Sequence, residues 1–237
     1  MSNIVYGGTY VSGYDIGVLM LDSKFPRIVG DVGNAKTWDF PVLFKKVENA
    51  TPTKVVLNLK MKDIQPFIDA ARELEKNGVK AITTSCGFLA LFQKELSEAV
   101  SVPVFTSALI MLPMISRMIG NKKILVLTAN SDTLTKKHIE SVCGSIDDIN
   151  MSIVGTQTKP TFTHFTVQNW DSVDLDKCEN DIMETIENAM LNDEYSAILL
   201  ECTNMPPYSD KIRKKFGLPV FDFVSLMNFV HSTVFGC

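Results

Sequence analysis

The segment VKAITTSC at residues 79–86 aligns without a gap with the segment YSAILLEC at residues 195–202, so that Cys86 falls on Cys202 at an offset of 116 positions. The same offset places VPVF at residues 102–105 on LPVF at residues 218–221. Two matched blocks in one register predict an internal duplication, and self-similarity of this kind decides the whole fold.

An earlier apolar run also repeats, because residues 16–19 correspond to residues 124–127 at a slightly different offset of 108. Short apolar runs alternate with amphipathic stretches along the chain, which predicts an α/β fold of parallel strands flanked by helices. One helix is predicted to begin after Asp63, its N-cap, and to end at Asn77-Gly78. A second helix is predicted from Leu175 to near Asn192. The predicted strands are Ile16–Leu21, Val55–Leu59, Val79–Thr83, Val102–Phe105, Lys123–Thr128, Ser152–Gly155, Ala197–Leu200 and Leu218–Phe221.

The chain has 237 residues, of which 46% are hydrophobic and 21% charged, enough for one large domain or two smaller ones. No linker rich in proline, glycine or serine divides it. We expect two closely joined α/β halves, one formed by residues 1–105 with 222–237 and the other by residues 106–221.

The composition also excludes several classes of partner. Lys and Arg total 23 against 27 Asp and Glu, for a net charge of −4, and no basic run is interleaved with aromatic residues, so a nucleic-acid partner is not expected. Residues 1–14 lack the pattern of a signal peptide, and the apolar stretch 107–119 is too short and too interrupted to span a membrane. Five distant cysteines without a CxxC pair predict free thiols and a cytoplasmic protein, and the three histidines have no metal-ligand spacing. We therefore expect no metal or other cofactor.

Cys86 and Cys202 each follow a predicted strand and precede a predicted helix, which begins after Gly87 in the first half and near Asn204 in the second. Ligands bind at the carboxyl ends of parallel strands, so each thiol lies at the functional edge of its half. If a pseudo-twofold axis relates the halves, a ligand between them has one sulfur on each side. A helix N-terminus beside each thiol should lower its pKa, which predicts an acid–base pair for proton transfer at a carbon atom.

Other roles for the cysteines were weighed against this one. Cys143, Cys178 and Cys237 are interpreted as small packing residues. A phosphatase loop needs an arginine six positions after its cysteine, but Phe92 and Tyr208 occupy those positions. A cysteine hydrolase stays open, although the sequence assigns no histidine partner to either thiol.

The segment after the first strand, residues 21–27, leaves the sheet at the same edge and carries polar groups that can reach a substrate. Arg27 is one of only four arginines, and its planar guanidinium suits a substrate carboxylate. The alternative is a solvated loop in which Asp22 caps a turn.

With SCGF at residues 85–88 and ECTNMP at residues 201–206, the chain resembles the aspartate/glutamate/hydantoin racemase superfamily over nearly its whole length. The resemblance implies two flavodoxin-like halves with the active site in the cleft between them, no pyridoxal phosphate, and one catalytic cysteine per half. Those roles fall to Cys86 and Cys202. Homodimers are common in such families, so a homo-oligomer is expected.

The resemblance also implies further substrate-binding residues. Cys202-Thr203 before a proline-bearing helix start resembles the Cys-Thr-x-x-Pro signature, in which Thr203 helps to hold the substrate carboxylate. Asp22 resembles the first-strand aspartate of glutamate racemases, which supports the nearby cysteine, and Thr128 resembles a substrate-contacting threonine. Ser85, Gly87 and Asn204, which flank the two cysteines, complete the expected set.

Two departures bear on the substrate. Gly87-Phe88 stands where typical glutamate and aspartate racemases have Asn-Thr, and Asn204 stands where glutamate racemases have histidine. The resemblance therefore implies a reaction class: a cofactor-independent racemase or epimerase that inverts a carbon next to the carboxylate of an amino acid, aspartate- or glutamate-like, or of a related small molecule. The alternatives are a maleate-type cis–trans isomerase, a hydantoin racemase or a non-catalytic small-molecule-binding protein. Two cysteines argue against the decarboxylases of the superfamily, which resemble single-cysteine members.

Overall fold

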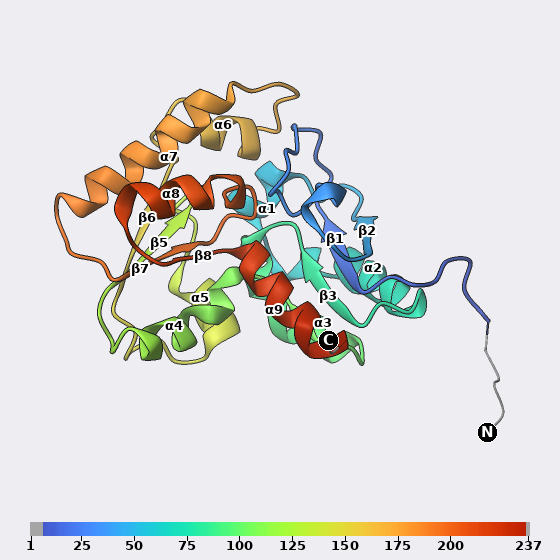
Figure 1. Ribbon diagram of the computed structural model, residues 1–237. Coiled ribbons are helices and arrows are strands. Elements are labelled where there is room, and N and C mark those ends of the chain that lie inside the picture. Colours follow the sequence, from blue (N-terminus) through green and yellow to red (C-terminus); the bar gives the residue numbers. More distant parts are fainter. Residues whose placement is uncertain (1–6, 236–237) are drawn as a thin grey trace.

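The computed structural model describes residues 7–235 (Figure 1). Cys237 and the first six residues of the segment expected to lack a signal peptide lie outside this range. Two four-stranded parallel sheets, ordered β2-β1-β3-β4 and β6-β5-β7-β8, form the two halves expected from the sequence. The strands are β1 (Ile16–Met20), β2 (Val42–Lys46), β3 (Ala81–Thr84), β4 (Val104–Phe105), β5 (Ile124–Thr128), β6 (Met151–Gly155), β7 (Ala197–Leu200) and β8 (Val220–Phe221).

Helices flank both sheets, as expected for the α/β class. Several connections begin as short 3-10 helices, among them Gly87–Phe92 after β3 and Pro206–Tyr208 after β7. The α-helices are α1 (Pro52–Asn58), α2 (Gln65–Lys76), α3 (Gln93–Ala99), α4 (Leu112–Met118), α5 (Lys136–Cys143), α6 (Phe162–Val167), α7 (Leu175–Met190), α8 (Ser209–Phe216) and α9 (Phe223–Phe235).

Strand pairing follows the two offsets found in the sequence. β1 pairs with β3 so that Ile16 lies opposite Ala81, and β5 pairs with β7 so that Ile124 lies opposite Ala197. Both halves have the order 2-1-3-4, which is the order of the first four strands of flavodoxin-like sheets. In this arrangement a ligand binds outside the carboxyl ends of the strands, where the connections leave in opposite directions.

The central strands form the cores of the two halves because both faces of each sheet are covered. Every residue of β3, β5 and β7 is buried. In the first half Gly17 of β1 lies directly under Leu74 of α2, and a Cβ atom at Gly17 would come within 2.9 Å of the leucine side chain. The small residue therefore allows close packing of α2 on the sheet.

Two of the expected elements are wrong. Val55–Leu59 is not a strand: Pro52 starts α1 at a position where a missing N–H costs nothing, and Thr51 Oγ1 accepts a hydrogen bond from Lys54 N. The second strand is β2 instead, an edge strand that is only partly buried and therefore lacks a continuous apolar signal. The N-cap of α2 is Ile64, because Asp63 belongs to a 3-10 turn in which its carboxylate accepts from Lys60 N.

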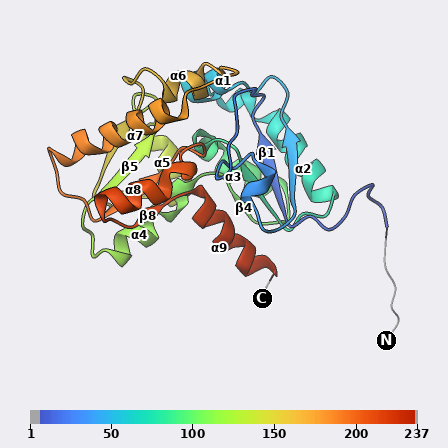
Figure 2. The ribbon, with the colours of Figure 1, turned by 45° about the horizontal axis from the view of Figure 1, so that its top comes forward.

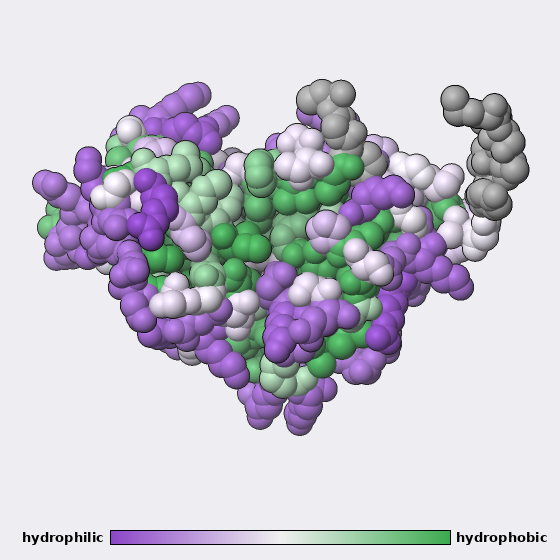
Figure 3. All heavy atoms as spheres, turned by 90° about the horizontal axis from the view of Figure 1, so that it is seen from below, coloured by the Kyte–Doolittle hydropathy of each residue, from purple (hydrophilic) through white to green (hydrophobic). Residues whose placement is uncertain are grey.

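Helix α9 follows β8 but packs against the first half. His231 Nε2 lies 2.8 Å from Asp15 Oδ2, and its ring stacks on Phe40 with centroids 3.8 Å apart. The face seen from below has many hydrophobic side chains over its centre and mostly hydrophilic side chains at its margins (Figure 3). The homo-oligomer stays a prediction.

Within residues 7–235, no helix combines the length and the apolar character needed to cross a bilayer. The same part of the chain holds no cluster of three His, Cys, Asp or Glu side chains that is arranged to bind a metal ion.

Candidate active site

Cys86 and Cys202 line one pocket between the two halves. The pocket has about 370 Å³ of atom-free space, a volume that includes its solvent-open mouth. Helices α1 and α6, which lie side by side in Figure 2, contribute residues from opposite halves. The lining residues are Leu21, Phe25, Pro52, Val56, Ser85, Cys86, Gly87, Phe88, Ala129, Thr166, Val167, Glu201, Cys202, Thr203 and Asn204.

The two cysteines occupy equivalent turns because the residues before them are fixed in the same way. Ser85 N donates to Leu19 O at 3.0 Å, and Glu201 N donates to Leu127 O at 2.8 Å. After each of these pairs the chain leaves its sheet. The turn at Cys86 leads directly into a 3-10 helix. The α-helix expected after Gly87 therefore begins later, as α3 at Gln93.

Burial dominates the electrostatics of both thiols. It raises the pKa of Cys86 to about 12, with a further rise from the negative charge of Glu201, against a smaller lowering by Arg27. Burial also raises the pKa of Cys202 well above its ordinary value, and Glu201 again adds to the rise. The sequence predicted that helix N-termini lower the pKa of each thiol, and this prediction is wrong. The backbone N–H groups of Phe88 and Asn204 do lower the thiol pKa values, but desolvation raises them by more.

Glu201 is a buried carboxyl group in the pocket wall that the sequence reasoning did not select. Its residue is 0% exposed, Oε2 accepts a hydrogen bond of 2.7 Å from Thr128 Oγ1, and Oε1 has no hydrogen-bond partner. Burial raises the pKa of this carboxyl to about 7, and the Thr128 hydrogen bond opposes the rise. The aligned repeat could have revealed this residue, because an acidic residue precedes Cys202 at the position where Ser85 precedes Cys86.

Gly87 provides the space that Glu201 occupies. A Cβ atom at Gly87 would overlap Glu201 Oε1 and lie 2.7 Å from the Glu201 carbonyl oxygen. Glycine at this position, one of the departures noted in the sequence, is therefore matched to the buried acid of the other half.

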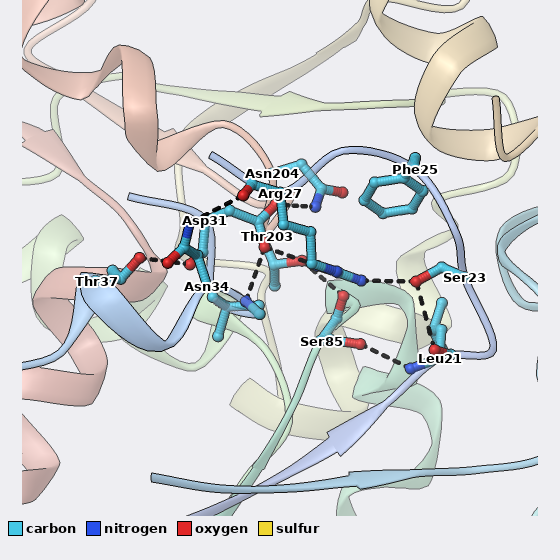
Figure 4. Close-up of polar contacts among 12 residues, drawn as sticks. Leu21, Ser23, Phe25, Arg27, Asp31, Asn34, Thr37, Ser85, Thr203 and Asn204 are labelled. Atoms are coloured by element: carbon cyan, nitrogen blue, oxygen red, sulfur yellow. Dashed lines mark hydrogen bonds and ion pairs between the residues drawn. The ribbon is translucent and has the colours of Figure 1, made fainter. Parts of the chain in front are cut away.

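A polar network connects the loop after β1 with Asn204, two residues after Cys202 (Figure 4). Arg27 donates to Asp31 at 2.7 Å and to Ser23 at 2.9 Å, and its guanidinium lies 4.5 Å from the centroid of the Phe25 ring. Asp31 also accepts from Asn204 Nδ2 at 2.5 Å, and Asn204 Oδ1 lies 3.7 Å from the Cys202 sulfur. The loop of the first half thus orients a residue of the second.

The structure brings most of the expected site residues together. Ser85, Gly87, Thr203 and Asn204 line the pocket with the two cysteines, and Thr203 Oγ1 donates to Ser85 O at 2.7 Å. Asp22, Arg27 and Thr128 are not among the lining residues. Asp22 is half-buried and pairs with Lys46 at 3.5 Å, Arg27 pairs with Asp31, and Thr128 lies behind Glu201. Their direct contact with a substrate stays a prediction.

No histidine lines the pocket in the part of the chain that the structure describes. His138 packs edge-on against Phe88 with ring centroids 5.3 Å apart, and burial lowers its pKa to about 4. A cysteine hydrolase that relies on a thiol–histidine pair therefore has no support in this geometry.

Comparison with known proteins identifies relatives of two kinds. The chain is 34% identical over 223 residues to dimethylsulfoniopropionate lyase 3 of Emiliania huxleyi, covering 90% of this chain and 58% of the relative. It is 35% identical over 222 residues to dimethylsulfoniopropionate lyase of Durusdinium sp. clade D, covering 90% of this chain and 73% of that one. The chain thus spans little more than half the length of the first relative.

Among solved structures, glutamate racemase isoform RacE1 from Bacillus anthracis superimposes with a TM-score of 0.65 at 17% identity, covering 93% of this chain and 81% of the racemase. This likeness confirms the fold of two α/β halves. The sequence family described as Asp/Glu/hydantoin racemase matches residues 52–227, a range that includes both pocket cysteines and Glu201. The chain therefore belongs to the Asp/Glu/hydantoin racemase family.

Proposed function

We propose that this chain is a lyase that removes a proton from the carbon next to a carboxylate and expels a sulfonium group from the following carbon, with dimethylsulfoniopropionate as its substrate. The observation that carries the proposal is the pocket: two thiols at matched strand ends face a wall whose only charged side chain, among the described residues, is Glu201. The names of the relatives support the choice of substrate.

The chemistry of the wall fits a sulfonium compound better than an acidic amino acid. Aspartate and glutamate carry two carboxylates, and no Lys, Arg or His lines the described pocket to pair with the second one. A dimethylsulfonium group is cationic and partly apolar. The rings of Phe25 and Phe88 are suitable partners for such a group, and the carboxylate of Glu201 attracts it when the substrate enters. The substrate carboxylate then takes the polar groups around Thr203 and Asn204.

In this proposal Cys86 is the base. Its thiolate is favoured by the positive charge of Arg27, whereas Asp31 and Cys86 itself disfavour the thiolate of Cys202. The thiolate takes the proton from the carbon next to the carboxylate. The electrons of that C–H bond form the new C=C bond, and the electrons of the breaking C–S bond leave on sulfur. The products are acrylate and neutral dimethyl sulfide.

The test is cleavage of dimethylsulfoniopropionate by the purified chain, followed as dimethyl sulfide by gas chromatography. We expect Cys86→Ser to lower kcat by at least about a hundredfold, in line with the loss of a general base. Cys202→Ser should lower kcat less, because elimination needs one base. Cys143→Ser is the control, since Cys143 lies outside the pocket and contacts Leu109 O. Absence of dimethyl sulfide with the unaltered chain would contradict the proposal.

A second candidate is the racemase or epimerase expected from the sequence. The presence of Cys86 and Cys202 at equivalent turns beside one pocket supports this candidate, because inversion needs one acid–base group for each face of the carbon. A panel of L- and D-amino acids and hydantoins in deuterated water separates the two candidates. A racemase stops interconverting the enantiomers when either cysteine is replaced by serine. Each single variant then exchanges the α-hydrogen of only one enantiomer, and the two variants act on opposite enantiomers.

A further inference from the structure

We propose that Glu201 is the proton acceptor of this pocket: its carboxylate takes the proton of the Cys86 thiol and delivers it to solvent once in each turnover. The inference rests on the lyase function proposed above. It assigns a role to a side chain that lies outside the pair of cysteines expected to carry the chemistry.

The position of Glu201 supports this role. The residue is completely buried, precedes Cys202 directly, and packs against Gly87, the neighbour of Cys86. One carboxyl oxygen accepts a hydrogen bond from Thr128, while the other lies beside Gly87 and has no hydrogen-bond partner. A buried polar atom without a partner costs free energy, so its retention points to a function.

The thiols need such an acceptor. Both are buried and favour the protonated state, so neither supplies a thiolate at neutral pH without a group that removes its proton. The other lining side chains of the described pocket are apolar, hydroxyl or amide groups, none of which gains or loses a proton near neutral pH. Glu201 has a pKa of about 7, so it exists in both states there.

The proton balance of the elimination requires a group of this kind. Before reaction Glu201 is ionised and Cys86 carries its proton. Transfer of the thiol proton to the carboxylate leaves the electron pair on sulfur, and that thiolate then takes the substrate proton. When acrylate and dimethyl sulfide have left, Cys86 and Glu201 are both protonated. The carboxyl group releases one proton to water, which is the net proton of the reaction.

The break in the repeat agrees with this balance. Ser85 occupies the position equivalent to Glu201, so the two halves supply two thiols but only one buried acid. A serine hydroxyl does not ionise near neutral pH, and here Ser85 Oγ accepts a hydrogen bond from Leu21 N at 2.9 Å. One acceptor serves a reaction that uses one base and releases one proton.

The first experiment compares Glu201→Gln with the unaltered chain. We expect kcat/KM for dimethylsulfoniopropionate at pH 7 to fall about a hundredfold. In the unaltered chain we expect kcat/KM to rise with pH about a midpoint near 7, the pKa of Glu201, and in Glu201→Gln this rise should disappear. The thiols should nevertheless react faster with iodoacetamide at pH 8, because removal of the carboxylate charge lowers their pKa values. A purely structural role would not combine slower catalysis with more reactive thiols.

Thr128→Val provides a second variant that keeps the acid. Thr128 lowers the pKa of Glu201 through its hydrogen bond, so its loss should move the midpoint of the pH profile to higher pH. Glu95→Gln is the matched control: Glu95 also has a buried carboxyl oxygen without a partner, but it lies on α3 and outside the pocket. This control should leave the pH profile and the alkylation rate unchanged.

The outcomes separate the two proposals. A pH profile of Glu201→Gln like that of the unaltered chain, or an unchanged rate of alkylation, overturns the role of Glu201. If the unaltered chain releases no dimethyl sulfide but Glu201→Gln still alkylates faster, the lyase function falls, and the coupling between Glu201 and the thiols is supported.

Discussion

Gly87 and Glu201 show how a single residue in one half depends on a residue in the other. The carboxyl group fills the space that a side chain at position 87 would need, and it does so next to Cys86. Sequence reasoning identified both cysteines and most of the residues beside them, because the repeat and the short motifs mark those positions directly. It did not select Glu201, since the environment that changes its pKa comes from Gly87 and Thr128, which are distant in sequence.

This dependence makes Gly87→Ala informative. The added methyl group would overlap Glu201 Oε1 and approach the Glu201 backbone, so the carboxyl group has to leave its present position. We expect kcat to fall by at least about tenfold, with a smaller change in KM, because a displaced acid–base group affects proton transfer more than binding. Steady-state kinetics of dimethyl sulfide release measures both.

Gly17→Ala is the comparison for this variant. It also introduces a close contact, with Leu74, but in the core of the first half and away from the pocket. It should lower stability and leave kcat nearly unchanged. Equal kinetic effects of the two substitutions would indicate that Gly87 serves packing alone.

At the scale of elements, the site is made by the turns that follow β3 and β7. The sequence located these turns because each central strand is a continuous buried run that ends in a cysteine. It failed for α1, which lines the pocket with Pro52 and Val56, and for the edge strand β2. Val55, Val56 and Leu57 resemble a strand in composition, but Thr51 and Pro52 start a helix there, and the capping interactions outweigh β-propensity.

The two turns are joined by Thr203, whose hydroxyl donates to Ser85 O across the interface between the halves. Both groups are buried, so Thr203→Val leaves a carbonyl oxygen unpaired, and we expect the free energy of unfolding to fall by about 1–3 kcal/mol. Urea denaturation followed by circular dichroism measures this loss. Thr203→Ser keeps the hydroxyl and should recover most of it, whereas equal losses in both variants would contradict the role of the hydrogen bond.

At the scale of the whole molecule, the duplication gives two similar halves, and the function depends on where they differ. Both sheets have the same order and equivalent register, as the repeat implies for two similar halves, and the fold class was predictable from the sequence for this reason. The relative placement of the turns was not, because it depends on contacts such as Asp31 with Asn204 that join distant segments. The asymmetry places one buried acid beside two thiols, and a buried acid affects stability as well as chemistry.

The buried acid makes the stability of the chain depend on pH. The pKa of Glu201 is raised from its ordinary value of 4.5 to about 7 in the folded state, so the folded chain holds this proton more tightly than the unfolded chain. Its contribution to stability is complete below pH 4.5 and is lost as the pH rises through 7, a loss of about 3 kcal/mol.

Glu201→Gln has no such loss. Its stability relative to the unaltered chain should therefore improve by about 3 kcal/mol between pH 4 and pH 8, measured by urea denaturation at both values. Taking the difference between variants cancels the titration of all other groups. A stability difference independent of pH would mean that Glu201 does not titrate between these limits, and the acid could then not exchange a proton with Cys86 at neutral pH.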